Sequence, residues 1–175
     1  MLDYCRSFGI PTAVFRMSCI YGQRQMGTEE QGWVAHFLIR GLEGEPITIY
    51  GDGRQVRDIL DVRDAVEAYV RAWQRIERVQ GHAMNLGGGP ANAISLLQLI
   101  EEIGAITGRK VDLRFEDWRP GDQHWYVSDT SKARDMLDLA RPREWRDGVA
   151  RLAAWLAEER GLETKPGMQL ASVAE

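Results

Sequence analysis

Apolar residues follow two patterns along this chain, and each pattern predicts one kind of element. Short continuous runs rich in β-branched and aromatic residues predict strands, and such runs suit strands covered on both faces of a parallel sheet. Stretches in which apolar residues recur every three or four positions predict amphipathic helices. Strands are expected at 12–17, 47–50, 82–86, 111–115 and 125–127, and helices at 1–8, 29–40, 61–76, 96–107, 129–138 and 145–161. Ile59-Leu60 is a further short apolar run. The alternation of the two kinds predicts an α/β fold.

Two of these helices carry capping signals at their starts. Asp61 is placed to accept a hydrogen bond from the first turn of the helix that follows it. Ser95 and Gln98 have the spacing of a capping box. The apolar stripe of the helix after Asp61, the side expected to face the core, consists of Val62, Val66, Tyr69, Trp73 and Ile76.

Glycines mark the expected turns and loops. Gly41 and Gly44 are expected to end the helix that precedes them. Residues 18–27 are polar and contain glycine, so a loop is expected there, in which a ligand could sit. The segment Gly87-Gly-Gly-Pro90 lacks the spaced glycines of a dinucleotide fingerprint and is interpreted as a structural turn.

Residues 47–64 combine features of an anion-binding site. The strand at 47–50 ends in Gly51-Asp-Gly53, whose glycines supply the positive φ angles of a tight turn. Arg54 and Arg57 follow, and the planar guanidinium group pairs well with phosphate or carboxylate oxygens. A hairpin with surface arginines explains the same residues, and this alternative stays open.

Composition narrows the classes of function. The net charge is −4 and the pI is near 5.5, which argues against general nucleic-acid binding. No apolar run of about twenty residues and no signal-peptide pattern occur, so no membrane or secreted setting is indicated. The chain has 2 cysteines and 3 histidines, without disulfide-framework or metal-ligand spacing. A reduced, cytoplasmic setting and no metal site are therefore expected.

Three motifs in sequence order resemble one enzyme family. They are Arg16-Met-Ser-Cys-Ile-Tyr-Gly22, Tyr50-Gly-Asp-Gly-Arg-Gln-Val-Arg-Asp58 and Asp117-Trp-Arg-Pro-Gly-Asp-Gln123. The second resembles the nucleotide-sugar-binding segment of the extended short-chain dehydrogenase/reductases, the NAD-dependent sugar epimerases and dehydratases. The other two most resemble the CDP-paratose 2-epimerase (CDP-tyvelose epimerase) branch.

The resemblance implies a fold with two parts. One is a partial Rossmann-like sheet formed by the last strands of a dinucleotide-binding domain, and the other is a small α/β substrate-binding lobe. Residues 1–161 are expected to form the C-terminal part of an NAD-dependent epimerase/dehydratase domain. Residues 162–175 show no periodicity and are expected to be a disordered tail.

The resemblance also assigns substrate contacts. It implies that Arg57 and Arg119 bind the diphosphate of a nucleotide-sugar and that Asp122 contacts its ribose. The two arginines are far apart in sequence, so only the fold can bring them together. Two independent surface salt bridges are the alternative reading.

Three further residues are candidates for the substrate-binding lobe. Tyr50 could stack on the base, because aromatic faces stack on bases with a gain of about 1–3 kcal/mol. Packing of Tyr50 within a sheet is the alternative. Gln31 and Trp33 stand where family members place substrate contacts.

The resemblance places the cofactor next to residues 17–19. Met17 and Ser18 match the segment beside the nicotinamide of NAD, and Cys19 stands where many relatives have an asparagine that contacts the diphosphate. A thiolate nucleophile at Cys19 is unsupported, because no basic group adjoins it in sequence to lower its pKa.

Two family motifs do not occur in this sequence. They are the Gly-x-x-Gly-x-x-Gly cofactor fingerprint and the Tyr-x-x-x-Lys pair that supplies the general base.

We therefore expect this chain to be the substrate-binding half of a CDP-paratose 2-epimerase-like enzyme, inactive alone and with weak or no affinity for NAD. Its expected partners are a nucleotide-diphosphate sugar, with a CDP-sugar favoured, and a missing N-terminal half. The alternatives are a non-catalytic nucleotide-sugar-binding module and half of a split UDP- or dTDP-sugar 4-epimerase or 4,6-dehydratase.

Overall fold

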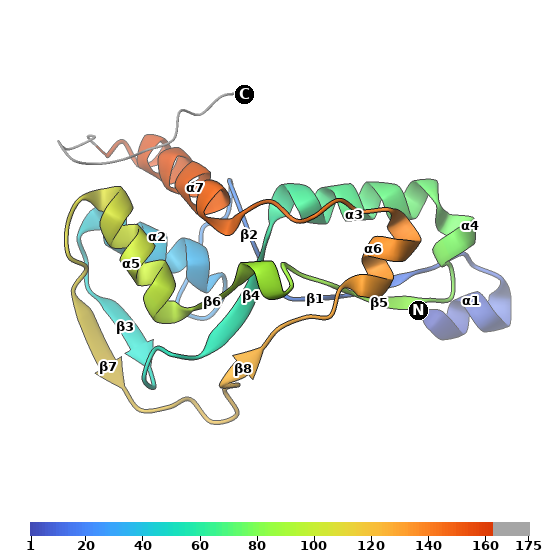
Figure 1. Ribbon diagram of the computed structural model, residues 1–175, viewed down its shortest axis with the longest axis horizontal. Helices are drawn as coiled ribbons and strands as arrows, with labels where there is room; N and C mark the ends of the chain where they lie inside the picture. Colours follow the sequence, from blue (N-terminus) through green and yellow to red (C-terminus); the bar gives the residue numbers. More distant parts are fainter. Residues whose placement is uncertain (163–175) are drawn as a thin grey trace.

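A computed structural model describes residues 1–162 of the chain, and it confirms the expected α/β class (Figure 1). The helices are α1 (Leu2–Phe8), α2 (Trp33–Glu43), α3 (Val62–Gln74), α4 (Ile76–Val79), α5 (Leu96–Thr107), α6 (Ser131–Leu137) and α7 (Trp145–Glu159). The strands are β1 (Val14–Met17), β2 (Cys19–Tyr21), β3 (Ile47–Tyr50), β4 (Val56–Asp61), β5 (Ala83–Leu86), β6 (Ala93–Ser95), β7 (Leu113–Glu116) and β8 (Trp125–Tyr126). Among residues 1–162, no helix is long and apolar enough to cross a membrane.

Strand β4 is the centre of the sheet structure. It pairs in parallel with β2 and β8 and antiparallel with β6. Strands β1 and β5 form a separate parallel pair, and β3 pairs in parallel with β7. The hairpin considered for residues 47–61 is therefore wrong, because β3 and β4 on either side of the glycine turn pair with different partners.

Two hydrophobic cores lie on opposite sides of β4, and the neighbouring residues Ile59 and Leu60 belong to the larger and the smaller core. Figure 1 shows α2, α5 and α7 gathered at one end and α3, α4 and α6 at the other. The larger core, centred on Leu38, Leu99 and Leu152, joins α2, α5 and α7. The smaller core joins α3 and α6 to β5 through residues such as Ala68 and Met84. The site described below lies at the end of the molecule that holds the larger core.

The expected caps and turns are found. The Asp61 side chain accepts a hydrogen bond from the backbone N–H of Arg63, and Ser95 and Gln98 form the reciprocal capping box. Gly51 and Gly53 both have positive φ angles, as the turn between β3 and β4 requires. These features depend on neighbours in sequence, which is why a local pattern was sufficient to predict them.

Two expectations about residues 18–44 were wrong in part. The expected loop at 18–27 contains strand β2, because its backbone pairs with β4, which is distant in sequence. The helix expected at 29–40 begins at Trp33 and continues through Gly41 to Glu43. Gly41 stays helical because α2 meets α5 there, and a Cβ at Gly41 would lie 2.3 Å from Cγ2 of Ile103.

The stripe expected to bury α3 was wrong at three of its five positions, whereas Ile76, which lies in α4, packs against the smaller core as expected. Val66, Tyr69 and Trp73 are 55%, 51% and 77% exposed. The buried face of α3 carries Ala65, Ala68 and Ala72 instead. Small side chains let a helix approach a sheet closely, so tertiary packing selected the alanine face and left the larger apolar residues outside.

The expected tail lies almost wholly outside the described residues. Of residues 162–175, only Leu162 is described, and its side chain is partly buried against the larger core. Its backbone N–H donates to the carbonyl of Ala157, so this residue continues the end of α7.

Candidate functional site

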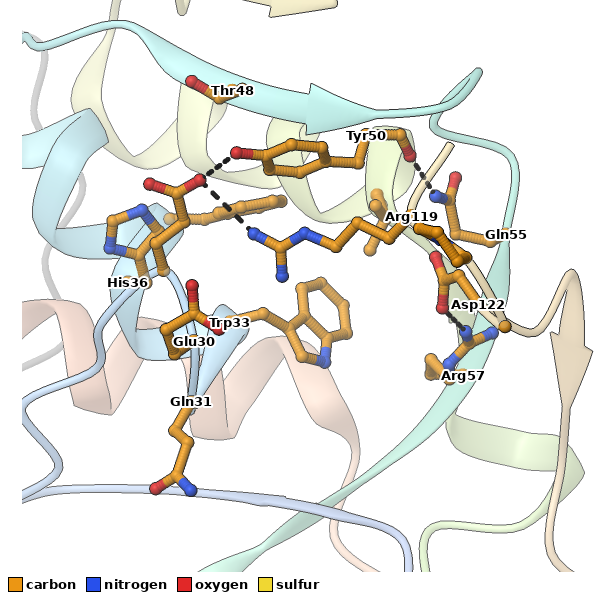
Figure 2. A pocket seen from close by; sticks show the side chains of 16 residues that line it. Glu30, Gln31, Trp33, His36, Thr48, Tyr50, Gln55, Arg57, Arg119 and Asp122 are labelled. Carbon is orange, nitrogen blue, oxygen red and sulfur yellow. Dashed lines mark hydrogen bonds and ion pairs between the residues drawn. The ribbon is translucent and has the colours of Figure 1, made fainter. Parts of the chain in front are cut away.

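A pocket of about 390 Å³ opens between the start of α2, strand β3 and the loop at residues 119–122. This volume is in the range typical of small-molecule sites. The six residues expected to contact substrate all line it, and they come from four separate segments of the chain (Figure 2). They are Gln31, Trp33, Tyr50, Arg57, Arg119 and Asp122.

Arg57 is held at one side of the pocket by Asp122. Its Nη2 donates to Oδ1 of Asp122 over 2.7 Å, and its Nη1 donates to the carbonyl of Val56 over 2.8 Å. The two side chains are 18% and 28% exposed, so the pair is partly shielded from water. Strand β4 supplies the arginine, and the 119–122 loop brings the aspartate to it.

Arg119 lies across the face of Tyr50, with its guanidinium carbon 3.9 Å from the ring centroid. Its Nη2 donates to Oε1 of Glu29 over 3.3 Å, and the Tyr50 hydroxyl donates to the same carboxylate oxygen. The hydrogen bond from Tyr50, and then Arg119, hold the pKa of Glu29 below its usual value. The hydrogen bond to Glu29 raises the pKa of Tyr50 in turn. Glu29 therefore stays ionised and Tyr50 stays neutral near pH 7.

The pocket thus brings together two guanidinium groups that the sequence separates widely. Each has a carboxylate partner, Asp122 for Arg57 and Glu29 for Arg119, and Figure 2 shows Arg57, Asp122 and Arg119 around one hollow. Guanidinium groups bind diphosphate oxygens by the same paired hydrogen bonds that they make to carboxylates. An anion that enters the pocket would therefore have to displace these carboxylates.

Aromatic and polar side chains complete the lining. Trp33 lies edge-on to Phe37, with ring centroids 5.7 Å apart, at the first turn of α2. Gln31 is exposed, and its backbone N–H donates to the hydroxyl of Thr28. His36 also lines the pocket, and burial followed by the nearby Arg40 lowers the pKa of its imidazole. That group is therefore neutral near pH 7.

Gln55 is a pocket residue that the sequence reasoning missed. Its side chain is 3% exposed and donates from Nε2 to the carbonyl of Tyr50 over 2.7 Å. Its Oε1 is buried without a hydrogen-bond partner among the described residues. A buried acceptor without a partner is costly, and this oxygen is covered by neighbouring atoms, so it faces the protein interior and not the pocket. Its place between Arg54 and Arg57 was the available signal, whereas nothing in sequence singled out Glu29 or His36.

The residues expected beside the cofactor do not line this pocket. Met17 is 51% exposed at the end of β1, where its sulfur meets the Tyr69 hydroxyl at 3.4 Å. The Ser18 hydroxyl lies 2.6 Å from both the backbone carbonyl and Oδ1 of Asp58. Burial raises the pKa of the Cys19 thiol to about 12, so the group stays protonated and does not act as a nucleophile.

Asp58, the partner of Ser18, is fully buried and holds the glycine turn in place. Its Oδ2 accepts from the Ser128 hydroxyl over 2.7 Å and from the backbone N–H of Gly89 over 2.9 Å. A Cβ at Gly88 would lie 2.0 Å from the carbonyl oxygen of Ile59. These close contacts support the structural interpretation of residues 87–90.

The sequence matches one family profile and many related proteins. Residues 1–87 match the profile of the NAD dependent epimerase/dehydratase family. The chain belongs to that family. One relative of this family member is the CDP-paratose 2-epimerase of Salmonella typhi, which is 37% identical over 162 residues. The matched part covers 89% of this chain and 47% of the relative.

Solved structures of the epimerase/dehydratase family share the fold of this chain. One is the UDP-glucuronic acid 4-epimerase of Bacillus cereus in complex with UDP-glucuronic acid and NAD, with a TM-score of 0.80 and 28% identity over 90% of this chain and 48% of that chain. Another is the UDP-glucose 4-epimerase of Thermotoga maritima with UDP-glucose, with a TM-score of 0.81 and 29% identity over 92% and 50%. This family member thus spans about half the length of the relatives it matches.

NAD is the cofactor of the family, and four of the similar structures with UDP-sugars contain it. The residues described here do not by themselves fit a dinucleotide site. The hydroxyl of Ser18 is already bonded to Asp58, and Met17 lies on an open face away from the pocket. For the described residues we therefore infer no catalytic step that involves NAD.

Proposed function

We propose that this chain is the nucleotide-sugar-binding part of an NAD-dependent sugar epimerase of the CDP-paratose 2-epimerase type. The observation that carries the proposal is the placement of Arg57 and Arg119 in one pocket. The chain would act as the C-terminal part of the epimerase domain, in the reduced cytoplasm that the unpaired Cys5 and Cys19 suit. A CDP-sugar is favoured because of the 37% identity to CDP-paratose 2-epimerase.

The diphosphate would bind at the centre of the pocket. Its oxygens would accept from Arg57 and Arg119, and the freed Asp122 could then accept from a ribose hydroxyl. Both arginines already lie at the wall of the hollow, so part of the cost of ordering their side chains is met before the ligand arrives.

The flanks of the pocket offer different chemistry. The indole of Trp33 provides a flat face for a base, while the carboxylate of Asp122, once freed, provides an acceptor for a hydroxyl group. This matches a ligand with a flat end, a doubly charged centre and a hydroxyl-bearing end.

The reaction of the intact enzyme would be epimerisation at C2 of the sugar. In the family, the glycine fingerprint holds NAD and the Tyr-x-x-x-Lys pair supplies the base. This sequence contains neither that pair nor the glycine fingerprint. In our proposal the chain binds and orients the nucleotide-sugar, and hydride transfer requires a second polypeptide segment.

The binding test is titration calorimetry with CDP, using Arg57→Ala and the matched control Arg54→Ala. Arg54 carries the same charge three positions away but is exposed and does not line the pocket. We expect micromolar binding that Arg57→Ala weakens about ten- to one-hundred-fold, because hydrogen bonds to charged groups contribute roughly 1.5–3 kcal/mol. Arg54→Ala should bind like the unchanged chain.

Equal losses of CDP affinity in both variants would show that the chain attracts CDP by overall charge and would contradict the proposed pocket.

A second candidate function is that of a 4-epimerase acting on UDP-sugars, which is favoured by the UDP-sugars in the similar structures. Parallel titrations with CDP, UDP and dTDP decide between them. Tighter binding of UDP than of CDP would replace the CDP-sugar assignment while leaving the site itself intact.

A further inference from the structure

The 119–122 loop, which carries Arg119 and Asp122 into the pocket, is a tight turn. The backbone N–H of Asp122 donates to the carbonyl of Arg119 over 3.1 Å. Pro120 at the second position and Gly121 at the third, with a φ of 79°, are the features of a type II turn. Figure 2 shows both side chains reaching into the pocket from this loop. The placement of the turn therefore decides where two of the expected ligand contacts lie.

The two ends of the loop are attached to neighbouring strands. The backbone N–H of Gly51, at the end of β3, donates to the carbonyl of Glu116 over 2.9 Å. The backbone N–H of Val56, at the start of β4, donates to the carbonyl of His124 over 3.0 Å. The loop thus spans the glycine turn between β3 and β4, and its ends are fixed on either side of that turn.

Trp118 lies directly on Gly51, just before the turn. A Cβ at Gly51 would lie 2.6 Å from Cδ2, 2.6 Å from Cε2 and 2.8 Å from Cε3 of the indole. Because these three atoms belong to the middle of the ring system and are almost equally near, the face of the indole meets Gly51. A side chain at position 51 would occupy the space of this ring. Glycine is therefore required there for the contact with Trp118 as well as for its positive φ.

His124 meets the same indole from the other end of the loop. The ring centroids of Trp118 and His124 lie 4.3 Å apart, with the ring planes at 46°. The contact joins the residues that precede and follow the turn, and so closes the loop at its base. Trp118 does not line the pocket, so it can affect a ligand only through the loop that it holds.

We propose that Trp118 is a positioning residue of the ligand site, whose contacts with Gly51 and His124 hold the 119–122 loop with Arg119 and Asp122 facing the ligand. Without these contacts the ligand itself would have to order the loop, and ordering of loops and long side chains lowers affinity. The inference rests on the proposed function, because that function assigns Arg119 and Asp122 to the nucleotide-sugar.

The first test is titration calorimetry with CDP, using Trp118→Ala and the matched control Trp125→Ala. Trp125 is 69% exposed on β8, just beyond the loop, and does not line the pocket. Trp118→Ala should weaken CDP binding about five- to twenty-fold, because two side chains lose their prior order. Trp125→Ala should bind like the unchanged chain. Trp118→Phe should bind CDP within about twofold of the unchanged chain, since a flat ring can still cover Gly51.

A double variant tests whether Trp118 acts through the loop. In the Arg119→Ala chain, adding Trp118→Ala should weaken CDP binding by less than about threefold, because the main group that Trp118 positions is already gone. The full loss in that background would overturn the proposal, as would equal losses in Trp118→Ala and Trp125→Ala.

Nuclear magnetic resonance of the ligand-free chain gives an independent readout. The Arg119 guanidinium carbon lies 3.9 Å from the centroid of the Tyr50 ring, so the ring current should shift the Nε–H proton signal of Arg119. Trp118→Ala should abolish this shift, and Trp118→Phe should retain it. A shift retained in Trp118→Ala would overturn the proposal, even if urea denaturation showed a lower free energy of unfolding, because Trp118 would then only stabilise the fold.

The ligand-free readout separates this inference from the function proposed above. If Trp118→Ala abolishes the Arg119 shift in a chain that fails to bind CDP, the nucleotide-sugar assignment is rejected and the positioning of Arg119 by Trp118 is supported. If the unchanged chain binds CDP and Trp118→Ala binds it equally well, the positioning role alone is rejected.

Discussion

Glu29 is the residue that most changes the description of the site. It carries no family motif, yet its carboxylate contacts both the Arg119 guanidinium and the Tyr50 hydroxyl. The arginine expected to bind diphosphate is therefore engaged before any ligand arrives. A ligand must compete with this carboxylate for Arg119. Glu29 competes only when its carboxylate is ionised.

Replacing Glu29 by glutamine removes that competition. Glu29→Gln should tighten binding of CDP by about two- to five-fold, the range of partly exposed ion pairs. The effect should be present at pH 7, because Tyr50 and Arg119 lower the pKa of Glu29 and keep it charged there. Calorimetry at pH 7 measures the change.

Glu30→Gln is the control for this experiment, because Glu30 lines the same pocket without a hydrogen bond to Arg119 in the described contacts. A similar gain in both variants would indicate a general effect of negative charge. Weaker binding in Glu29→Gln would mean that Glu29 positions Arg119 for the ligand and does not compete with it.

At the scale of elements, α2 shows how packing overrides a local signal. Gly41 was expected to end the helix, and the helix continues through it to Gly44, whose left-handed φ of 77° closes it. The reason is the contact with α5, where Ile103 occupies the space that a side chain at position 41 would need. The crossing of α2 and α5 depends on that missing side chain.

Gly41→Ala sets two effects against each other. Alanine favours a helix over glycine by about 1 kcal/mol, whereas overpacking a core costs typically 1–3 kcal/mol. With a Cβ only 2.3 Å from Ile103, the steric cost should prevail and lower the free energy of unfolding by up to about 2 kcal/mol. Urea denaturation measures this change.

A double-mutant cycle with Ile103→Ala tests the cause. The combined cost of Gly41→Ala and Ile103→Ala should be smaller than the sum of the single costs, since the truncated side chain leaves room for the new methyl group. Additive costs would show that the loss in Gly41→Ala arises elsewhere in the helix.

At the scale of the whole molecule, β4 connects two regions with different tasks. One end of the strand carries Arg57 to the pocket, and the other ends in Asp61, the cap of α3. The pocket is built within the chain, whereas the face formed by α3 and β1 is open. The two ends of β4 thus differ in how far the described residues enclose them.

The purified 175-residue chain should therefore show no turnover of CDP-paratose, even with added NAD. The physical reason is the lack of the base and of the cofactor fingerprint in this sequence. Product analysis by chromatography measures this, with the complete Salmonella typhi enzyme as the positive control. Formation of the epimer by this chain alone would contradict the division of tasks.

Sequence reasoning succeeded where the cause was local. The cap at Asp61, the box at Ser95 and the positive-φ turn at Gly51 each depend on residues within a few positions. The family motifs pointed to Arg57 and Arg119, and the structure places both in the lining of one pocket, although the sequence contains nothing that measures the distance between them.

The sequence by itself determined the α/β class, the caps and the residue types of an anion site, because these follow from neighbours along the chain. Only the tertiary structure decided which face of α3 is buried, that Glu29 meets Arg119, and that Gln55 leaves a buried acceptor free. Each of those outcomes is set by contact between segments distant in sequence. Packing distances and hydrogen-bond partners across such contacts are properties of the folded chain, and no local pattern contains them.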